Sequence, residues 1–202
     1  MDVKPLRERQ AEETRHLLIS IARDLFTERG YAATSIEDIV QRAGVARGAL
    51  YHHFSGKDAL FRSVYETVQA EVATRVMAAA GLAMSEPWAA VRAGLSAFLD
   101  ACLEPTFRRV VVLDSVAVLQ QDAWDGGIEH IELPMLRTVL TPLVGAGLLP
   151  GVAVEPLVYV TLGGLYGAAL FIARSPEPEV ARGEVEAVID TLIGGLRAHV
   201  GP

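Results

Sequence analysis

The chain has almost no cysteine and no long uninterrupted apolar segment. Its 202 residues contain one cysteine, Cys102, which excludes an internal disulfide and a cysteine-rich zinc site. The first fifteen residues are charged rather than apolar, and small or charged residues interrupt every apolar run before it reaches membrane-spanning length. We therefore expect a soluble, cytoplasmic protein with no secretion signal and no membrane partner, in which Cys102 is a buried small hydrophobe.

Motifs of catalysis and metal binding are also scarce. His130 and Glu132 resemble part of a deaminase motif, but the cysteines that complete that motif do not follow downstream. No glycine-rich loop has a phosphate-binding form, and Cys102 has no evident basic partner. The adjacent residues His52 and His53 would point about 100° apart on a helix, so they cannot share a metal ion. The sequence predicts no enzyme, metal site or cofactor.

Helical periodicity runs through the chain, and no segment alternates convincingly as a strand. Residues 128–144 have helical composition, but Pro134 and Pro142 predict that this helix is kinked or split. The charged residues 1–10, which include Pro5, are predicted to form a flexible arm. The fold class is therefore all-α, with further helices expected over residues 12–29, 34–43, 46–53, 58–80, 88–103, 107–120, 154–174 and 179–199.

The stretch from Thr34 to Leu60 has the pattern of two short helices joined by a tight turn and followed at once by a third. Thr34 and Glu37 have the spacing of a capping box, and apolar residues then recur at helical intervals. Gly44 suits the left-handed residue that commonly ends a helix. Two helices joined in this way form a helix-turn-helix, whose second helix enters the major groove of DNA.

The second of these helices, from Ala46 or Arg47 to His53, would turn Leu50 and Phe54 inward. Its outer face would present short, small or polar residues, namely Arg47, Gly48, Ala49 and His52. Arg47 is the leading base reader, because its guanidinium group matches the guanine edge, although by itself it is also an ordinary surface arginine.

Two further residues are candidates for binding a DNA phosphate. Tyr51 is either a core tyrosine with a solvated hydroxyl or a phosphate ligand, or both. Lys57 lies in the first turn of the following helix, where a cation opposes the helix dipole unless it serves a nearby anion. A DNA phosphate would be such an anion.

The negative charge of the chain is unevenly distributed. Residues 1–62 carry a net charge of +1, while residues 63–202 carry −8, which together give the −7 of the whole chain. A nucleic-acid binder needs a local positive face rather than a positive total. The acidic composition therefore does not exclude DNA binding by the N-terminal part.

The order AGV-xx-G-x-LY-x-HF-xx-K-xx-L, from Ala43 to Leu60, resembles the N-terminal signature of the tetracycline-repressor (TetR) family over roughly residues 12 to 62. The resemblance implies a homodimer in which residues 12–58 form a three-helix domain that binds double-stranded operator DNA. Residues 59–202 would then form a helical domain for dimerisation and for a small-molecule inducer. The implied phosphate contacts are Thr34, Tyr51, His53 and Lys57, and the implied base readers are Arg47, Gly48, Ala49 and His52. Since Gly48 and Ala49 have almost no side chain, direct readout would be sparse.

Small residues gather in the last two predicted helices. Glycine in a helix interior costs roughly 1 kcal/mol relative to alanine, so the glycines at positions 163, 164, 167, 194 and 195 require a packing reason. One such reason is close packing against other helices of the same chain. The other is close packing across a dimer interface, which the wide apolar faces of both helices favour. The residues expected at a dimer interface are Gly163, Gly167, Ile189, Leu192, Ile193, Gly195 and Leu196.

A ligand pocket follows from the family resemblance alone. Taken singly, each candidate side chain is better explained as plain core, and the candidates are Phe98, Phe107, Asp114, Trp124, His130, Tyr159 and Tyr166. So few polar groups would suit a largely apolar compound. We therefore expect a repressor that its ligand releases from the operator; the alternative is a helical small-molecule carrier or scaffold without operator binding.

Overall fold

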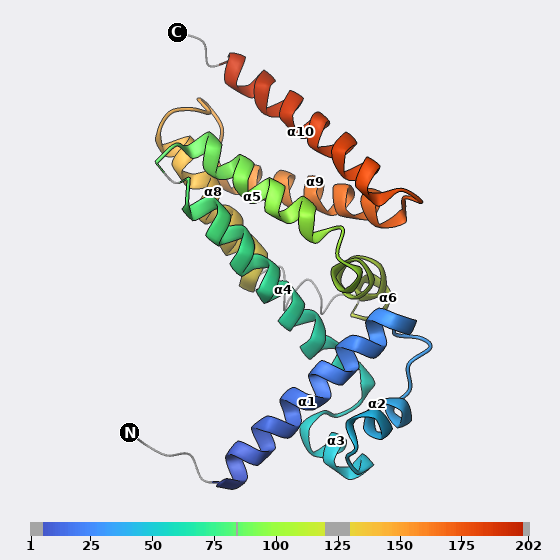
Figure 1. Cartoon of the computed structure of the whole chain (residues 1–202). Coiled ribbons are helices and arrows are strands. Elements are labelled where there is room, and N and C mark those ends of the chain that lie inside the picture. The colour runs from blue at the N-terminus through green and yellow to red at the C-terminus, as the bar shows by residue number, and fades with distance from the viewer. Residues whose placement is uncertain (1–5, 84, 120–129, 200–202) are drawn as a thin grey trace.

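The computed structural model describes residues 6–83, 85–119 and 130–199. Within these ranges the chain consists of helices and the turns between them, without a strand, which confirms the predicted all-α fold. Figure 1 shows helices α1 to α3 grouped at one end of the molecule and α10 at the other, with the long helix α4 between them. The termini of the described chain therefore belong to opposite parts of the fold.

The N-terminal group consists of α1 (Leu6–Arg29), α2 (Ile36–Ala43) and α3 (Arg47–His53). The flexible arm predicted over residues 1–10 is wrong for residues 6–10, which belong to α1. Residues 1–5 lie outside the described residues. Residues 7–13 are mostly Arg, Glu, Gln and Ala, which are strong helix formers, and their propensity extends the helix beyond its apolar face.

The predicted capping box is wrong by one residue. Ser35, rather than Thr34, is the N-cap of α2, and the box is completed by Asp38, whose carboxylate accepts from the Ser35 backbone at 2.9 Å. Thr34 is 1% exposed, and its hydroxyl donates to the carbonyl oxygen of Gly30 at 2.8 Å. Both registers fit the sequence pattern, and the burial of Thr34 decides between them.

Helix α4 (Lys57–Gly81) leaves the N-terminal group and pairs along much of its length with α5 (Pro87–Ala101). This confirms the helix that was predicted over residues 88–103, which begins at Pro87. The Glu86 side chain caps α5 by accepting from the backbone N–H groups of Trp88 and Ala89. Proline loses nothing at this position, since the first N–H groups of a helix have no partner within it.

The next segment departs from the predicted regular helix over residues 107–120. Phe107–Asp114 forms a π-helix, η1, and Ser115–Val118 forms the short helix α6. Such wide turns are rare and occur frequently at functional sites. Helix α8 (Leu133–Gly145) holds Pro134 in its first turn and Pro142 inside the helix.

Helices α9 (Val154–Arg174) and α10 (Pro178–His199) confirm the predicted pair of long C-terminal helices. Helix α9 packs against α8, η1 and α10, and α10 contacts α5 as well as α9. In Figure 1, α10 forms the outer edge of this layer.

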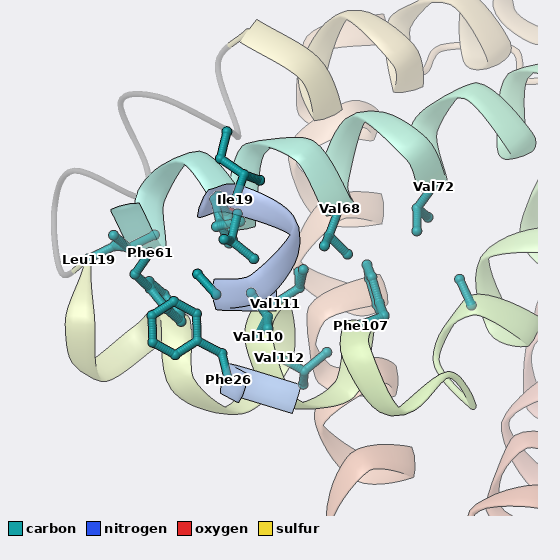
Figure 2. Close-up of a cluster of buried hydrophobic side chains, with 14 of the residues drawn as sticks. Ile19, Phe26, Phe61, Val68, Val72, Phe107, Val110, Val111, Val112 and Leu119 are labelled. Atoms are coloured by element: carbon teal, nitrogen blue, oxygen red, sulfur yellow. The ribbon is translucent and has the colours of Figure 1, made fainter. Parts of the chain in front are cut away.

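One buried cluster joins the N-terminal group to the rest of the molecule. Figure 2 shows Phe26 of α1 and Phe61 of α4 beside Val110, Val111 and Val112 of η1. The rings of Phe26 and Phe61 meet edge to face, with centroids 5.2 Å apart. A second cluster lies among α5, α8 and α9. Because side chains of α1 and η1 are packed together in the first cluster, a displacement of η1 would also displace the helices packed around α1.

Candidate nucleic-acid interface and ligand cavity

Helices α2 and α3 are joined by a turn that depends on Gly44. Its φ of 68° lies in the left-handed region, where a side chain would be strained, and its N–H bonds to carbonyl oxygens at the end of α2. The N–H of Val45 closes the turn by donating to the carbonyl oxygen of Val40 at 3.1 Å. This geometry fixes the direction in which α3 leaves α2.

Helix α3 has the two faces that the sequence predicted. Leu50 is fully buried, and Phe54, just beyond the helix, is 5% exposed. Gly48 and His52 are exposed on the opposite face, with Ala49 partly exposed beside them, and Arg47 is exposed at the first position of the helix. All four predicted base readers are therefore at least partly accessible to solvent.

Arg47 is not free on that surface. Its guanidinium group forms an ion pair with Glu37 of α2, and it donates to the Tyr51 hydroxyl at 3.2 Å. The guanidinium carbon also lies 5.5 Å from the centroid of the Tyr51 ring. The hydrogen bond with Tyr51, followed by the charge of Glu37, raises the pKa of Arg47. A contact of Arg47 with any other acceptor would have to compete with the ion pair to Glu37.

Lys57 and Thr34 both support the turn between α1 and α2. The Lys57 ammonium donates to the carbonyl oxygens of Tyr31 and Thr34, each at 2.9 Å, and lies 4.0 Å from the centroid of the Tyr31 ring. The third N–H of this ammonium remains for another acceptor. The Thr34 hydroxyl faces the interior, so Thr34 stabilises the turn from within.

Tyr51 and His52 are exposed, whereas His53 is partly buried. Burial lowers the pKa of His53, and the neighbouring His52 and Arg15 lower it further. A neutral imidazole retains one N–H, so His53 can still donate to a phosphate oxygen.

The predicted ligand residue Asp114 lies at the junction with the N-terminal group and does not line the cavity described below. Its Oδ2 accepts from the backbone N–H of Tyr31 at 2.8 Å and from Arg109 Nε at 3.2 Å. Arg109 packs against Gly30, where a Cβ atom would meet its Nη2 at 1.9 Å. Two side chains of η1 therefore hold the turn that leads from α1 to α2.

A cavity of about 50 Å³ lies between α4, α5, η1, α8 and α9. Three of the predicted ligand residues line it, namely Phe98, Phe107 and Tyr166. Two polar residues that the prediction missed, Gln69 and Glu132, also line it. No local pattern identifies Gln69, since α4 carries polar and charged residues along most of its length, while Glu132 is an acid at the start of an apolar helix. That contrast was the only available signal.

The other ligand candidates lie elsewhere. Tyr159 is 46% exposed, His130 is exposed, and neither lines the cavity. Trp124 lies outside the described residues. Of the six predicted ligand residues that the structure describes, three therefore meet at one place, namely Phe98, Phe107 and Tyr166.

A larger groove of about 1060 Å³ runs between α5, α8, α9 and α10. It shares wall residues with the small cavity, namely Val76, Phe98, Met135, Leu136 and Leu165. Gly164, Gly167 and Gly195 line the groove, which borders exposed apolar side chains of α9 and α10. The inner cavity and the groove are therefore neighbours that share one apolar wall.

The predicted interface glycines face open space in this chain. A Cβ atom added at Gly163, Gly167 or Gly195 would meet no atom within 4 Å. Packing within the described chain therefore does not account for these glycines. Leu192 and Leu196 are also exposed, at 62% and 44%, and Ile189 is partly buried, while Ile193 is 7% exposed and belongs to the core of its own chain.

Comparison with known proteins identifies both parts of the chain. A profile of the tetR family of bacterial regulatory proteins matches residues 18–64, and one of the tetracyclin repressor-like C-terminal domain matches residues 88–196. The regulator AcrR of Shigella flexneri is 38% identical over 63 residues, which are 31% of this chain and 29% of AcrR. The regulator TtgR of Pseudomonas putida is 45% identical over 62 residues, which are 29% of this chain and 30% of TtgR.

The match to a solved structure is longer. A tetR-family transcriptional regulator from Pectobacterium atrosepticum has 32% identity and a TM-score of 0.80, covering 93% of this chain and 96% of that one. The alignments with AcrR and TtgR, by contrast, span less than a third of those regulators. Since the C-terminal profile alone matches more than half of the sequence, the chain belongs to the tetR family of bacterial regulatory proteins.

Proposed function

We propose that this chain is a dimeric transcriptional repressor that leaves its operator when a small, largely apolar molecule binds. The proposal rests on one observation, namely that η1 contacts both the cavity and the turn between α1 and α2. Phe107 and Val111 line the cavity, while Arg109 and Asp114 of the same helix contact the turn between α1 and α2. A ligand that moves the cavity wall therefore moves the support of the DNA-binding helices.

In the proposed complex, α3 enters the major groove. Arg47 and His52 contact base edges, while Gly48 and Ala49 allow the helix to approach closely. Tyr51, His53 and the remaining N–H of Lys57 contact phosphates, which position the protein without specifying sequence. The exposed face of α3 and the carbonyl-bound ammonium of Lys57 support this assignment.

The proposed dimer uses α9 and α10. Among the described helices, α9 is the one long and apolar enough to cross a membrane, yet only 28% of its most apolar window is buried within the chain. Glycines that meet no atom and neighbouring exposed leucines suit close approach of a second copy. A second copy is also what a DNA-reading helix requires, since the two helices of a dimer lie about 34–36 Å apart, or a multiple of that, on the duplex. Dimerisation in solution without detergent would distinguish this role from membrane insertion.

Linkage makes the coupling between operator and ligand reciprocal. If the ligand favours an arrangement of η1 and α4 that moves the two α3 helices away from the separation that the operator requires, operator and ligand weaken each other by the same factor. A typical coupling is about 1 to 3 kcal/mol, which corresponds to roughly 5- to 150-fold in operator affinity.

The first experiment is selection of bound sequences from random double-stranded DNA by the purified chain. We expect a palindromic consensus and an affinity that falls steeply with salt. A small-molecule carrier or scaffold would yield no enriched sequence and no salt-dependent retention on DNA, and that result would refute the proposal.

A further inference from the structure

Glu132 immediately precedes α8, and its backbone is helical because residues 130–132 are π-helical and run directly into α8. Its side chain forms no helix cap. Its carboxylate lines the cavity and accepts from the Tyr166 hydroxyl, with both oxygens 3.2 Å from it. The carboxylate therefore has its polar partner inside the cavity wall.

A second polar pair extends this group. The Gln69 amide lines the cavity, donates to the Tyr65 hydroxyl at 2.5 Å, and also forms a hydrogen bond with Glu132. Tyr65 and Gln69 are 2% and 4% exposed. The cavity thus contains a small polar group, formed by α4, α8 and α9, within walls that are otherwise apolar.

No base faces this carboxylate. Among the residues that the structure describes as lining the cavity, none is Lys, Arg or His. Residues 120–129, which precede Glu132 closely in the sequence, contain no basic residue either. An acid in an apolar cavity without a counter-charge is costly, and it repels an anionic ligand.

The aromatic walls favour the same kind of ligand as the acid. Phe98, Phe107 and Tyr166 line the cavity, and the two phenylalanine rings meet edge to face with centroids 6.1 Å apart. The faces of aromatic rings attract cations, and more strongly where water is excluded. Carboxylate, hydroxyl and rings together form a site for a positively charged group.

The two volumes set the shape of that ligand. A cavity of about 50 Å³ holds little more than one or two waters, each occupying about 30 Å³ of liquid volume, so it can admit a small polar head but not a whole drug-sized molecule. The adjoining groove of about 1060 Å³ is apolar and shares five wall residues with the cavity. A ligand with a small head and an apolar body fits both spaces.

We propose that the ligand is an apolar molecule carrying a primary ammonium group, which binds between Glu132, Tyr166 and Gln69. Its apolar body extends into the part of the groove lined by α5 and α8, where Trp88, Leu95 and Leu140 lie, so that the glycines of α9 and α10 remain available to the second copy. The inference rests on the proposed function for its regulatory meaning, but the binding itself does not require operator release. The three N–H donors of the ammonium match the carboxylate, the hydroxyl oxygen and the amide oxygen. Charge pairing with Glu132 supplies the selectivity over neutral analogues.

The site should also respond to pH. Burial raises the pKa of Glu132, while the hydrogen bonds from Gln69 and Tyr166 act in the opposite direction. The titratable groups that face it, Tyr65 and Tyr166, have pKa values raised by burial, to about 12 for Tyr65, and stay neutral. As the pH falls through the pKa of Glu132, its charge is lost while the ammonium remains protonated. Affinity for an amine therefore decreases on acidification.

The test compares three compounds with one skeleton, namely phenylbutylamine, phenylbutanol and phenylbutanoic acid, by calorimetric titration of the full chain near neutral pH. We expect the amine to bind about tenfold or more tightly than the alcohol, since a hydrogen bond to a charged group contributes at least that factor, and the acid to bind most weakly. In Glu132→Gln the amine and the alcohol should bind alike, and the pH dependence should disappear.

Tyr166→Phe is the matched control, because it removes one hydrogen bond to Glu132 and keeps the charge. It should retain the preference for the amine. Thermal melting without ligand verifies that both variants fold. Failure of the amine to bind, or an equal or better affinity for the alcohol or the acid, would overturn the inference, as would a preference that survives in Glu132→Gln.

Operator binding separates this inference from the proposed function. If the amine binds through Glu132 but leaves the operator affinity unchanged, the ligand class stands and the proposed release fails. If the alcohol or the acid releases the operator and the amine does not, release stands and the ligand class is wrong.

Discussion

Replacing Asp114 by alanine should disconnect the ligand cavity from the DNA-binding helices. The Asp114 carboxylate, whose side chain is 17% exposed, accepts from the Tyr31 backbone and from Arg109. Its removal leaves the Tyr31 N–H without this partner, which costs about 1 to 3 kcal/mol for a buried group. The lost ion pair adds little, since the Arg109 side chain is 43% exposed and screened by water.

Two measurements on Asp114→Ala separate stability from coupling. Urea unfolding should show a loss near the lower end of that range. Operator titrations with and without a saturating ligand should show that ligand affinity is retained and that the ratio of the two operator affinities falls toward one. The control is Glu155→Ala, which breaks an exposed ion pair between α8 and α9, at 2.8 Å from Arg137, and should leave the ratio unchanged.

One outcome would exclude the contact between Asp114 of η1 and Tyr31 as the link between the cavity and the DNA-binding helices. If Asp114→Ala folds with the expected loss of stability but keeps the full ratio of operator affinities, the contact with Tyr31 does not transmit the signal. Coupling would then pass through the buried apolar contacts that η1 and α4 make with α1.

Three further predictions concern other parts of the molecule. Arg47→Ala should lower operator affinity about tenfold or more and relax the preference at one base pair, as measured on a selected operator and its single-base variants; unchanged preference would contradict the role of α3. Gly167→Leu should yield monomers or aggregates in sedimentation while helicity is retained, because Gly167 meets no atom of its own chain within 4 Å; an intact dimer would place the interface elsewhere. Burial raises the pKa of Cys102 to about 12, so iodoacetamide should modify it only after unfolding, whereas rapid alkylation of the native chain at neutral pH would contradict its burial.

Local signals made much of the fold predictable. Gly44 takes the left-handed conformation that its place after a helical pattern indicated, and Pro87 begins α5 as a proline at a first helical position should. Leu50 is buried and Arg47 is exposed, as the apolar and the charged character of these two side chains indicated. Each of these features depends on neighbours within a few residues.

Contacts between distant segments were not predictable in the same way. Asp114 reads as a polar residue on an apolar helix, but its partner Tyr31 lies 83 residues away and is reached through a backbone N–H. Glu132 and Tyr166 likewise meet across 34 residues. The π-helical turns of η1 also have no local signal in a run of valines, although they shape the wall between the cavity and α1.

The most direct test of the account is reciprocity between operator and ligand. Operator affinity should be measured by fluorescence anisotropy at fixed salt, with and without a saturating stabilising compound, and the affinity for that compound should then be measured with and without operator. We predict a decrease of roughly 5- to 150-fold in both, by the same factor. Equal operator affinity in the two titrations would contradict the account and leave a DNA-binding protein whose cavity does not regulate it.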